Sequence, residues 1–71
     1  MAHWSNAYSV GDLVEVAPGG ARFGNWQPGR VARKSIAGFP IVGVARSSGP
    51  DLHFAIDRKA DIRFPVPMVS P

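Results

Sequence analysis

The sequence predicts a small all-β domain, and three observations carry that prediction. The chain has 71 residues, which is enough for one small domain. Eight glycines and seven prolines interrupt every stretch before a helical pattern reaches ten residues. Between these breaks lie short runs rich in Val, Ile and Phe, as is typical of strands. The hydrophobic content of 45% and charged content of 18% favour a folded domain over a disordered chain.

The first elements are an arm and a strand. Residues 1–9 are polar with two aromatic side chains, and they predict an N-terminal arm. In the strand predicted over 13–17, two valines alternate with a glutamate, so one face is apolar and the other polar. A Pro-Gly-Gly sequence then ends the strand and opens a long loop that runs through Asn25.

The middle of the chain predicts two more strands. Residues 26–36 form the second one, with Pro28 and Gly29 near its start. Since proline donates no hydrogen bond to a sheet, this pair implies an edge, a bend or a bulge. A Gly-Phe-Pro turn leads into the third strand, predicted over 41–46.

The last part of the chain predicts two strands, a turn and a tail. In residues 52–57 large apolar side chains alternate strictly, which indicates the fourth strand. Residues 58–61 have room for one helical turn, and 62–64 form the closing strand. The tail, 65–71, contains three prolines and is expected to be extended.

Five short strands, a long first loop and one helical turn before the last strand fit an SH3-like barrel over residues 10–64. Strand alternation assigns the faces. The inward side chains, which form the expected core, are Val14, Val16, Val31, Val42, Val44, Leu52, Phe54, Ile56, Ile62 and Phe64. The outward side chains are Glu15, Arg33, Ile41, Gly43, Ala45, His53, Ala55, Asp57 and Arg63.

Composition excludes several kinds of site. The absence of cysteine removes disulfides and thiolate zinc sites, and His3 and His53 are too few and too far apart for a metal cage. No apolar run approaches the roughly 18 residues of a membrane span. The start shows no signal peptide, so we expect a cytoplasmic protein. A domain of this size has marginal stability as a monomer, and without disulfides or a metal site, association with other copies is the remaining way to stabilise it.

The sequence favours a non-catalytic protein. It contains no phosphate-cradling glycine loop before a helix, no glycine-flanked serine nucleophile and no acidic Mg²⁺ or Ca²⁺ loop. His53 is the one candidate catalytic residue, but general acid–base chemistry needs an orienting partner that the sequence does not identify.

The outward face of the third and fourth strands carries small, weakly polar side chains where a solvated sheet normally carries charged ones. This pattern predicts a self-association or partner surface. In a symmetric oligomer, copies of His53 would meet around an axis and respond to pH. The interface residues expected are Ile41, Gly43, Ala45, His53 and Ala55.

Aromatic and basic residues predict a binding surface at the mouth of the barrel. The residues favoured there are Phe23, Trp26, Arg30 and Phe39, followed by the basic strand face Arg33, Lys34 and Arg46. Arg22 lies in the preceding loop, and Tyr8 is a further candidate to close a ligand cleft with Phe23 and Trp26. Such a surface suits phosphates and bases or a protein partner, and the net charge of +3 permits nucleic acid without demanding it.

Part of the chain resembles the Tudor/Agenet group of SH3-like domains. The matching pieces are Gly11-Asp12, the Val-Glu-Val of the first strand, Gly24-Asn25-Trp26 before Val31, and the closing sequence ADIRFPVP. The resemblance covers most of residues 10–67. It implies an SH3-like barrel that works as a binding module.

The layout is also similar to that of the plasmid-borne type II dihydrofolate reductases. The matching pieces are SNAYSVGDLV, Trp26-Gln27 with a glycine shortly after, and the ADIR close. This resemblance implies a tetramer with folate and NADPH meeting in a central pore. The family's Val-Gln-Ile-Tyr motif would fall on 52–55 or 54–57, where this sequence reads LHFA or FAID.

The sequence thus predicts a non-catalytic, self-associating SH3-like binding module without a cofactor, whose partner is a protein or a nucleic acid. The alternative is an oligomeric reductase that uses NADPH between subunits. A third possibility is a small inhibitor or accessory protein from a mobile element.

Overall fold

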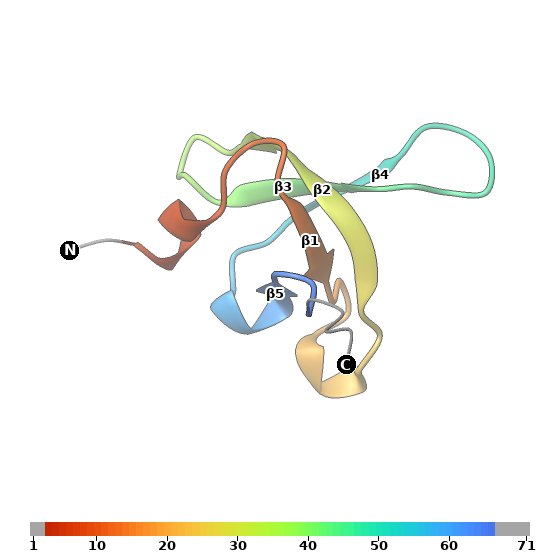
Figure 1. Cartoon of the computed structure of the whole chain (residues 1–71), viewed down its shortest axis with the longest axis horizontal. Coiled ribbons are helices and arrows are strands. Elements are labelled where there is room, and N and C mark those ends of the chain that lie inside the picture. Colours follow the sequence, from red (N-terminus) through yellow and green to blue (C-terminus); the bar gives the residue numbers. More distant parts are fainter. Residues whose placement is uncertain (1–2, 67–71) are drawn as a thin grey trace, which may run out of the picture.

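The computed structural model describes residues 3–66 and confirms the predicted fold class: an antiparallel all-β domain with a helical turn before the last strand (Figure 1). The strands are β1 (Leu13–Val16), β2 (Gln27–Lys34), β3 (Pro40–Val44), β4 (Leu52–Ala55) and β5 (Ile62–Arg63). Three turns of 3-10 helix are η1 (Trp4–Ala7), η2 (Ala21–Phe23) and η3 (Lys59–Asp61). Most of the predicted 65–71 tail lies outside the described residues.

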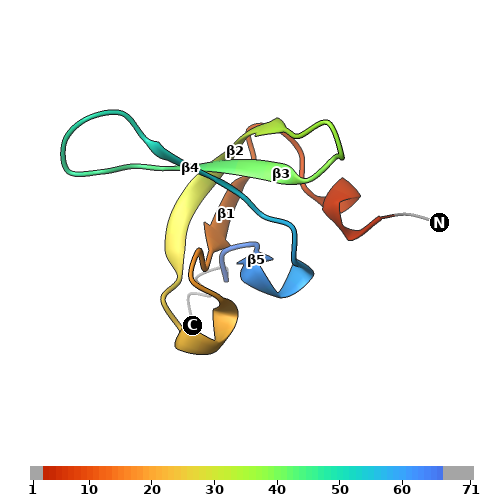
Figure 2. The same ribbon diagram turned by 180° about the vertical axis from the view of Figure 1, so that it is seen from behind.

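The strands form one sheet in the order β4-β3-β2-β1-β5. β2 is the long central strand, and it curves so that the β3–β4 hairpin runs crosswise to β1, while β5 lies at the opposite edge of the sheet (Figures 1 and 2). Its pairing with β3 shifts register between Val31 and Arg33, as in a β-bulge. The predicted irregularity therefore occurs in β2, but later than Pro28, which pairs in register with Glu15.

Gly29 lies on the concave face of the sheet, where a side chain would not fit. A Cβ atom at this position would lie 2.6 Å from Val42 Cγ1 and 2.8 Å from the carbonyl oxygen of Gly43. β2 and β3 approach closely here because residue 29 has no side chain.

The core is the cluster of side chains that strand alternation predicted. Its buried members are Val14, Val16, Val31, Val42, Val44, Ile56 and Ile62. Phe54 is half-buried and packs against this cluster, together with Trp4 and Tyr8. Alternation was sufficient here because each of these strands has one face against the core.

The assignment of two residues to the core is wrong. Leu52 is 45% exposed and Phe64 is 48% exposed. Leu52 opens β4 at the rim of the sheet, where no strand lies beyond it. Phe64 follows the last residue of β5, and its ring stacks on Tyr8 at a centroid distance of 4.7 Å instead of entering the core.

The prediction that Gly43 faces outward to solvent is also wrong, because Gly43 is buried. It pairs with His53 on the neighbouring strand. A Cβ atom at Gly43 would lie 3.2 Å from Cδ2 of the His53 ring, so this ring covers the glycine from the outer face. The space above this glycine on β3 is therefore filled by the histidine side chain from β4.

The segment predicted as an arm contains η1, which packs on the body of the domain. Ser5 is buried, and its hydroxyl lies 2.6 Å from Nδ1 of His3. Lys34 Nζ donates a hydrogen bond of 2.7 Å to the carbonyl oxygen of Ser5. Trp4 and Tyr8 pack against the core from this side, so the segment completes the hydrophobic cluster.

Candidate functional site

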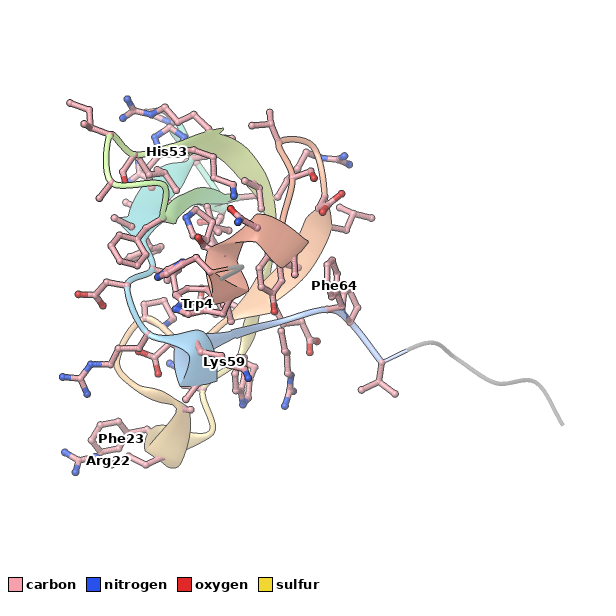
Figure 3. All side chains as sticks on the ribbon, turned by 90° about the vertical axis from the view of Figure 1, so that its left-hand side faces the viewer. Trp4, Arg22, Phe23, His53, Lys59 and Phe64 are labelled. Carbon is pink, nitrogen blue, oxygen red and sulfur yellow. The ribbon has the colours of Figure 1, made fainter. Side chains whose placement is uncertain are left out.

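A cleft of about 470 Å³ lies between the loop after β1 and the turn before β5. Its lining residues are Pro18, Gly19, Gly20, Ala21, Arg22, Arg58, Ala60 and Asp61. In the view of Figure 3, Arg22 and Phe23 lie at one end of the molecule with Lys59 above them, while His53 lies at the opposite end.

Hydrogen bonds between segments far apart in the sequence hold the two walls of the cleft together. The Ala17 N–H donates to the carbonyl oxygen of Asp61 at 2.9 Å. The Ala21 N–H donates to Oδ1 of Asp61 at 3.2 Å. Gly20 (φ 108°) and Gly24 (φ 67°) flank η2 with positive φ angles, which glycine adopts without strain. The loop therefore has a defined shape before any ligand binds.

The charges at the cleft are mainly positive. Arg22 and Arg58 line it from opposite walls, and Lys59 follows directly on the η3 side; all three are exposed. Asp61 is the one acidic residue that lines the cleft, and one of its carboxylate oxygens already accepts the Ala21 N–H. The arrangement suits a ligand that carries negative charge.

Phe23 gives this end of the molecule an open aromatic surface. Its side chain is 65% exposed, although phenylalanine is usually buried. The guanidinium carbon of Arg22 lies 4.8 Å from the centre of the ring, a cation–π contact. An aromatic ring with an arginine beside it offers a stacking surface and a hydrogen-bond donor together.

A second aromatic–arginine pair lies at the start of β2. The guanidinium carbon of Arg63 is 3.9 Å from the centre of the Trp26 ring. Arg63 Nε also donates a hydrogen bond of 2.8 Å to Oε1 of Glu15. Glu15 and Arg63 are paired across β1 and β5, so the sheet itself places this guanidinium over the indole.

The structure brings together only part of the predicted mouth. Phe23 and Trp26 both precede β2 on the η2 side of the domain. Phe39 instead lies directly before β3, beyond the other end of β2, with its ring centre 5.3 Å from that of His3 and 6.0 Å from that of Trp4. Arg30 lies on the outer face, where Nη1 donates 2.8 Å to the carbonyl oxygen of Gly11.

The predicted basic strand face is also divided. Lys34 donates its hydrogen bond to the carbonyl oxygen of Ser5, so its ammonium group fixes η1 to the sheet. Arg46 Nε donates 2.8 Å to the carbonyl oxygen of Pro50 and closes the β3–β4 loop. Arg33 is exposed on β2, opposite Ile41.

Tyr8 does not join Phe23 and Trp26 around a ligand. Its ring stacks on Phe64 and meets Trp4 edge to face at a centroid distance of 6.3 Å. Its hydroxyl group is 3.4 Å from the carbonyl oxygen of Ile62. Burial raises the pKa of the Tyr8 phenol above its ordinary value of 10.0.

The predicted interface residues lie across the outer face of β3 and β4. Pairing places Ile41 opposite Ala55 and Gly43 opposite His53. A shallow groove beside them is lined by Leu13, Pro28, Gly29, Arg30, Gly43, Ala45 and Asp51. This face is distinct from the cleft at η2 and η3.

Sequence reasoning missed Arg58, Lys59 and the pairing of Arg63 with Trp26. Arg58 lies 36 positions after Arg22 in the chain. The pairing of β1 with β5 and the bonds from Ala17 and Ala21 to Asp61 bring the two walls together. The sequence signal available was the run Arg58-Lys59 beside a predicted turn, which is also typical of a solvated loop.

No protein-family model, curated protein or solved structure matches this chain. Within residues 3–66, no helix is long and apolar enough to span a membrane. In the same part of the chain, no three His, Cys, Asp or Glu side chains gather where they would hold a metal ion.

Proposed function

We propose that this protein is a non-catalytic binding module for single-stranded nucleic acid. The proposed site is the basic–aromatic end, defined as Arg22, Phe23, Trp26, Arg58, Lys59 and Arg63. The single observation that carries the proposal is the exposed Phe23 ring with Arg22 packed over it, beside a cleft that holds a second arginine.

The cations of this end supply the part of binding that does not depend on base identity. Arg22 and Arg58 line one cleft, and Lys59 follows Arg58 in the chain. All three are exposed, so successive phosphates of a strand would meet positive charge there. Neutralising phosphates releases condensed counterions, which makes such binding strongly dependent on salt.

The aromatic rings favour a single strand over a duplex. Phe23 is open to solvent, and a base that stacks on it must have left its own helical stack. Trp26 is half-buried under Arg63, so this pair offers a more restricted second contact. Base–aromatic stacking is worth about 1–3 kcal/mol per base.

The test is a fluorescence-anisotropy titration with a fluorescein-labelled dT oligonucleotide at low salt. Replacing the ring with F23A removes the stacking surface, and we expect the affinity to fall about 5- to 150-fold, which is the cited stacking energy converted to a ratio. R58A is expected to weaken binding and to make the dependence on salt less steep, because one phosphate contact is lost.

R33A is the matched control, because it removes the same charge from an exposed position on β2. We expect it to leave the affinity near the wild-type value. The proposal is wrong if the wild-type protein does not bind the oligonucleotide at low salt, or if R33A and R58A weaken binding equally. Binding to an acidic protein but not to the oligonucleotide would assign this surface to a protein partner.

A further inference from the structure

β4 forms one edge of the sheet, and its outer edge is unprotected. It pairs with β3 over four consecutive residues without a register shift. The sequence Leu52-His53-Phe54-Ala55 contains no lysine, proline or other residue that commonly blocks strand addition. The opposite edge differs, since β5 has only two residues and Pro65 lies two positions after its end.

Hydrogen bonding assigns the direction of the backbone groups on β4. The Ile56 N–H donates to the carbonyl oxygen of Pro40 at 3.0 Å, toward β3. Backbone groups in a strand alternate in direction, so Phe54 and Leu52 also bond toward β3. The N–H and C=O groups of His53 and Ala55 therefore face away from the sheet, where they are free to pair with an added strand.

The concave side of this edge also lacks a cover. Leu52 is 45% exposed although its pairing partner, Val44, is buried. Phe54, the next side chain on the same face, is half-buried. An added strand would bury apolar surface here as well as satisfy the backbone groups of His53 and Ala55.

We propose that β4 pairs in antiparallel fashion with β4 of a second copy, around a two-fold axis at His53. His53 then lies opposite the partner's His53, and Leu52 lies opposite the partner's Phe54. Each copy gives the same N–H and C=O groups to the other, so the contact is self-complementary and the two sheets become continuous.

Side-chain chemistry favours this register, with a second copy as the occupant. Centring the axis on Phe54 would place Asp51 opposite the partner's Asp57, and like charges directly opposite destabilise a pair. Centring it on Ala55 would place Leu52 opposite the partner's Arg58. The axis at His53 matches the exposed Leu52 with the partner's Phe54, and it places Asp51 opposite the partner's Ala55, so no two like charges lie opposite each other.

The first test is the mass in solution by analytical ultracentrifugation, for the wild type and for A55P and A55S. Because the Ala55 N–H faces away from β3, proline removes it without breaking a bond inside the sheet, while serine retains it. We expect the wild type and A55S to be dimers and A55P to be a monomer with the same circular dichroism spectrum. A monomeric wild type at 200 µM, or a dimeric A55P, would overturn the proposal.

The second test determines the register and does not depend on the folding of A55P. The chain has no cysteine, so a single introduced thiol reports one position. Residues opposite each other in a hydrogen-bonded pair lie about 5.5 Å apart at Cα, within disulfide range. Mild oxidation is expected to cross-link H53C but not A55C. Cross-linking of A55C, or of neither variant, would overturn the register.

Discussion

Tyr8 is the one tyrosine of the chain, and its phenol is a direct probe of how the N-terminal segment packs. Burial raises its pKa because the charged phenolate loses hydration against Trp4 and Phe64. We expect absorbance at 295 nm to titrate above pH 10.0 in the folded protein and to return to the ordinary midpoint in denaturant.

The same shift makes stability depend on pH. Folded Tyr8 keeps its proton to higher pH than unfolded Tyr8, so the unfolded chain binds fewer protons above the ordinary pKa of 10.0. Stability from this group is complete below that pH and declines as the pH rises through it. Urea unfolding at pH 9 and pH 11 should show the decline, and Y8F should show less of it; equal declines would contradict this account.

Gly29 gives a sharp prediction about packing between β2 and β3. G29A would press a methyl group against Val42 Cγ1 and the carbonyl oxygen of Gly43, and overpacking of this kind costs about 1–3 kcal/mol. G19A is the control, because a Cβ there meets nothing within 4 Å. Urea unfolding curves of the two variants measure the difference, and equal stabilities would refute the close approach.

Several residue positions followed from the sequence and others did not. Period-two alternation located Val14, Val16 and Val42 correctly, because strands with one covered face repeat every two residues. Alternation failed at Leu52 and Phe64, since facing the core side does not bury a side chain where the sheet ends. Gly43 was assigned to the surface because its covering ring comes from the next strand.

Among the elements, the N-terminal segment contributes more than its composition predicted. η1 places Trp4 and Tyr8 on the core cluster. W4A should therefore lower the free energy of unfolding by about 2 kcal/mol, less than the loss for a fully buried tryptophan because Trp4 is half-buried. I36A is the control, since Ile36 is fully exposed in the turn after β2. Equal unfolding midpoints for the two variants would contradict the packing of η1.

The candidate site could be predicted only in part, and the elements show why. Phe23 and Trp26 are three residues apart, so any fold that exposes the η2 loop keeps them near each other. The cleft wall from η3 depends on the bond between Ala21 and Asp61, which are 40 positions apart. Phe39 was grouped with them by residue type, but the length of β2 separates it from Phe23.

For the whole molecule, the two proposals occupy different surfaces. The basic–aromatic end surrounds η2 and η3, and the proposed dimer contact runs along β4. A55P should therefore bind the dT oligonucleotide with the wild-type affinity per chain, even as a monomer. Anisotropy titrations of both proteins at equal chain concentration check this, and loss of binding in A55P would show that the site needs both copies.

The location of the nucleic-acid site is measured most directly by amide chemical shifts of isotopically labelled protein during titration with unlabelled dT oligonucleotide. The account predicts shifts concentrated in 19–26 and 58–63, with 40–55 unchanged. Shifts concentrated on β3 and β4, or none at saturating oligonucleotide in low salt, would contradict it.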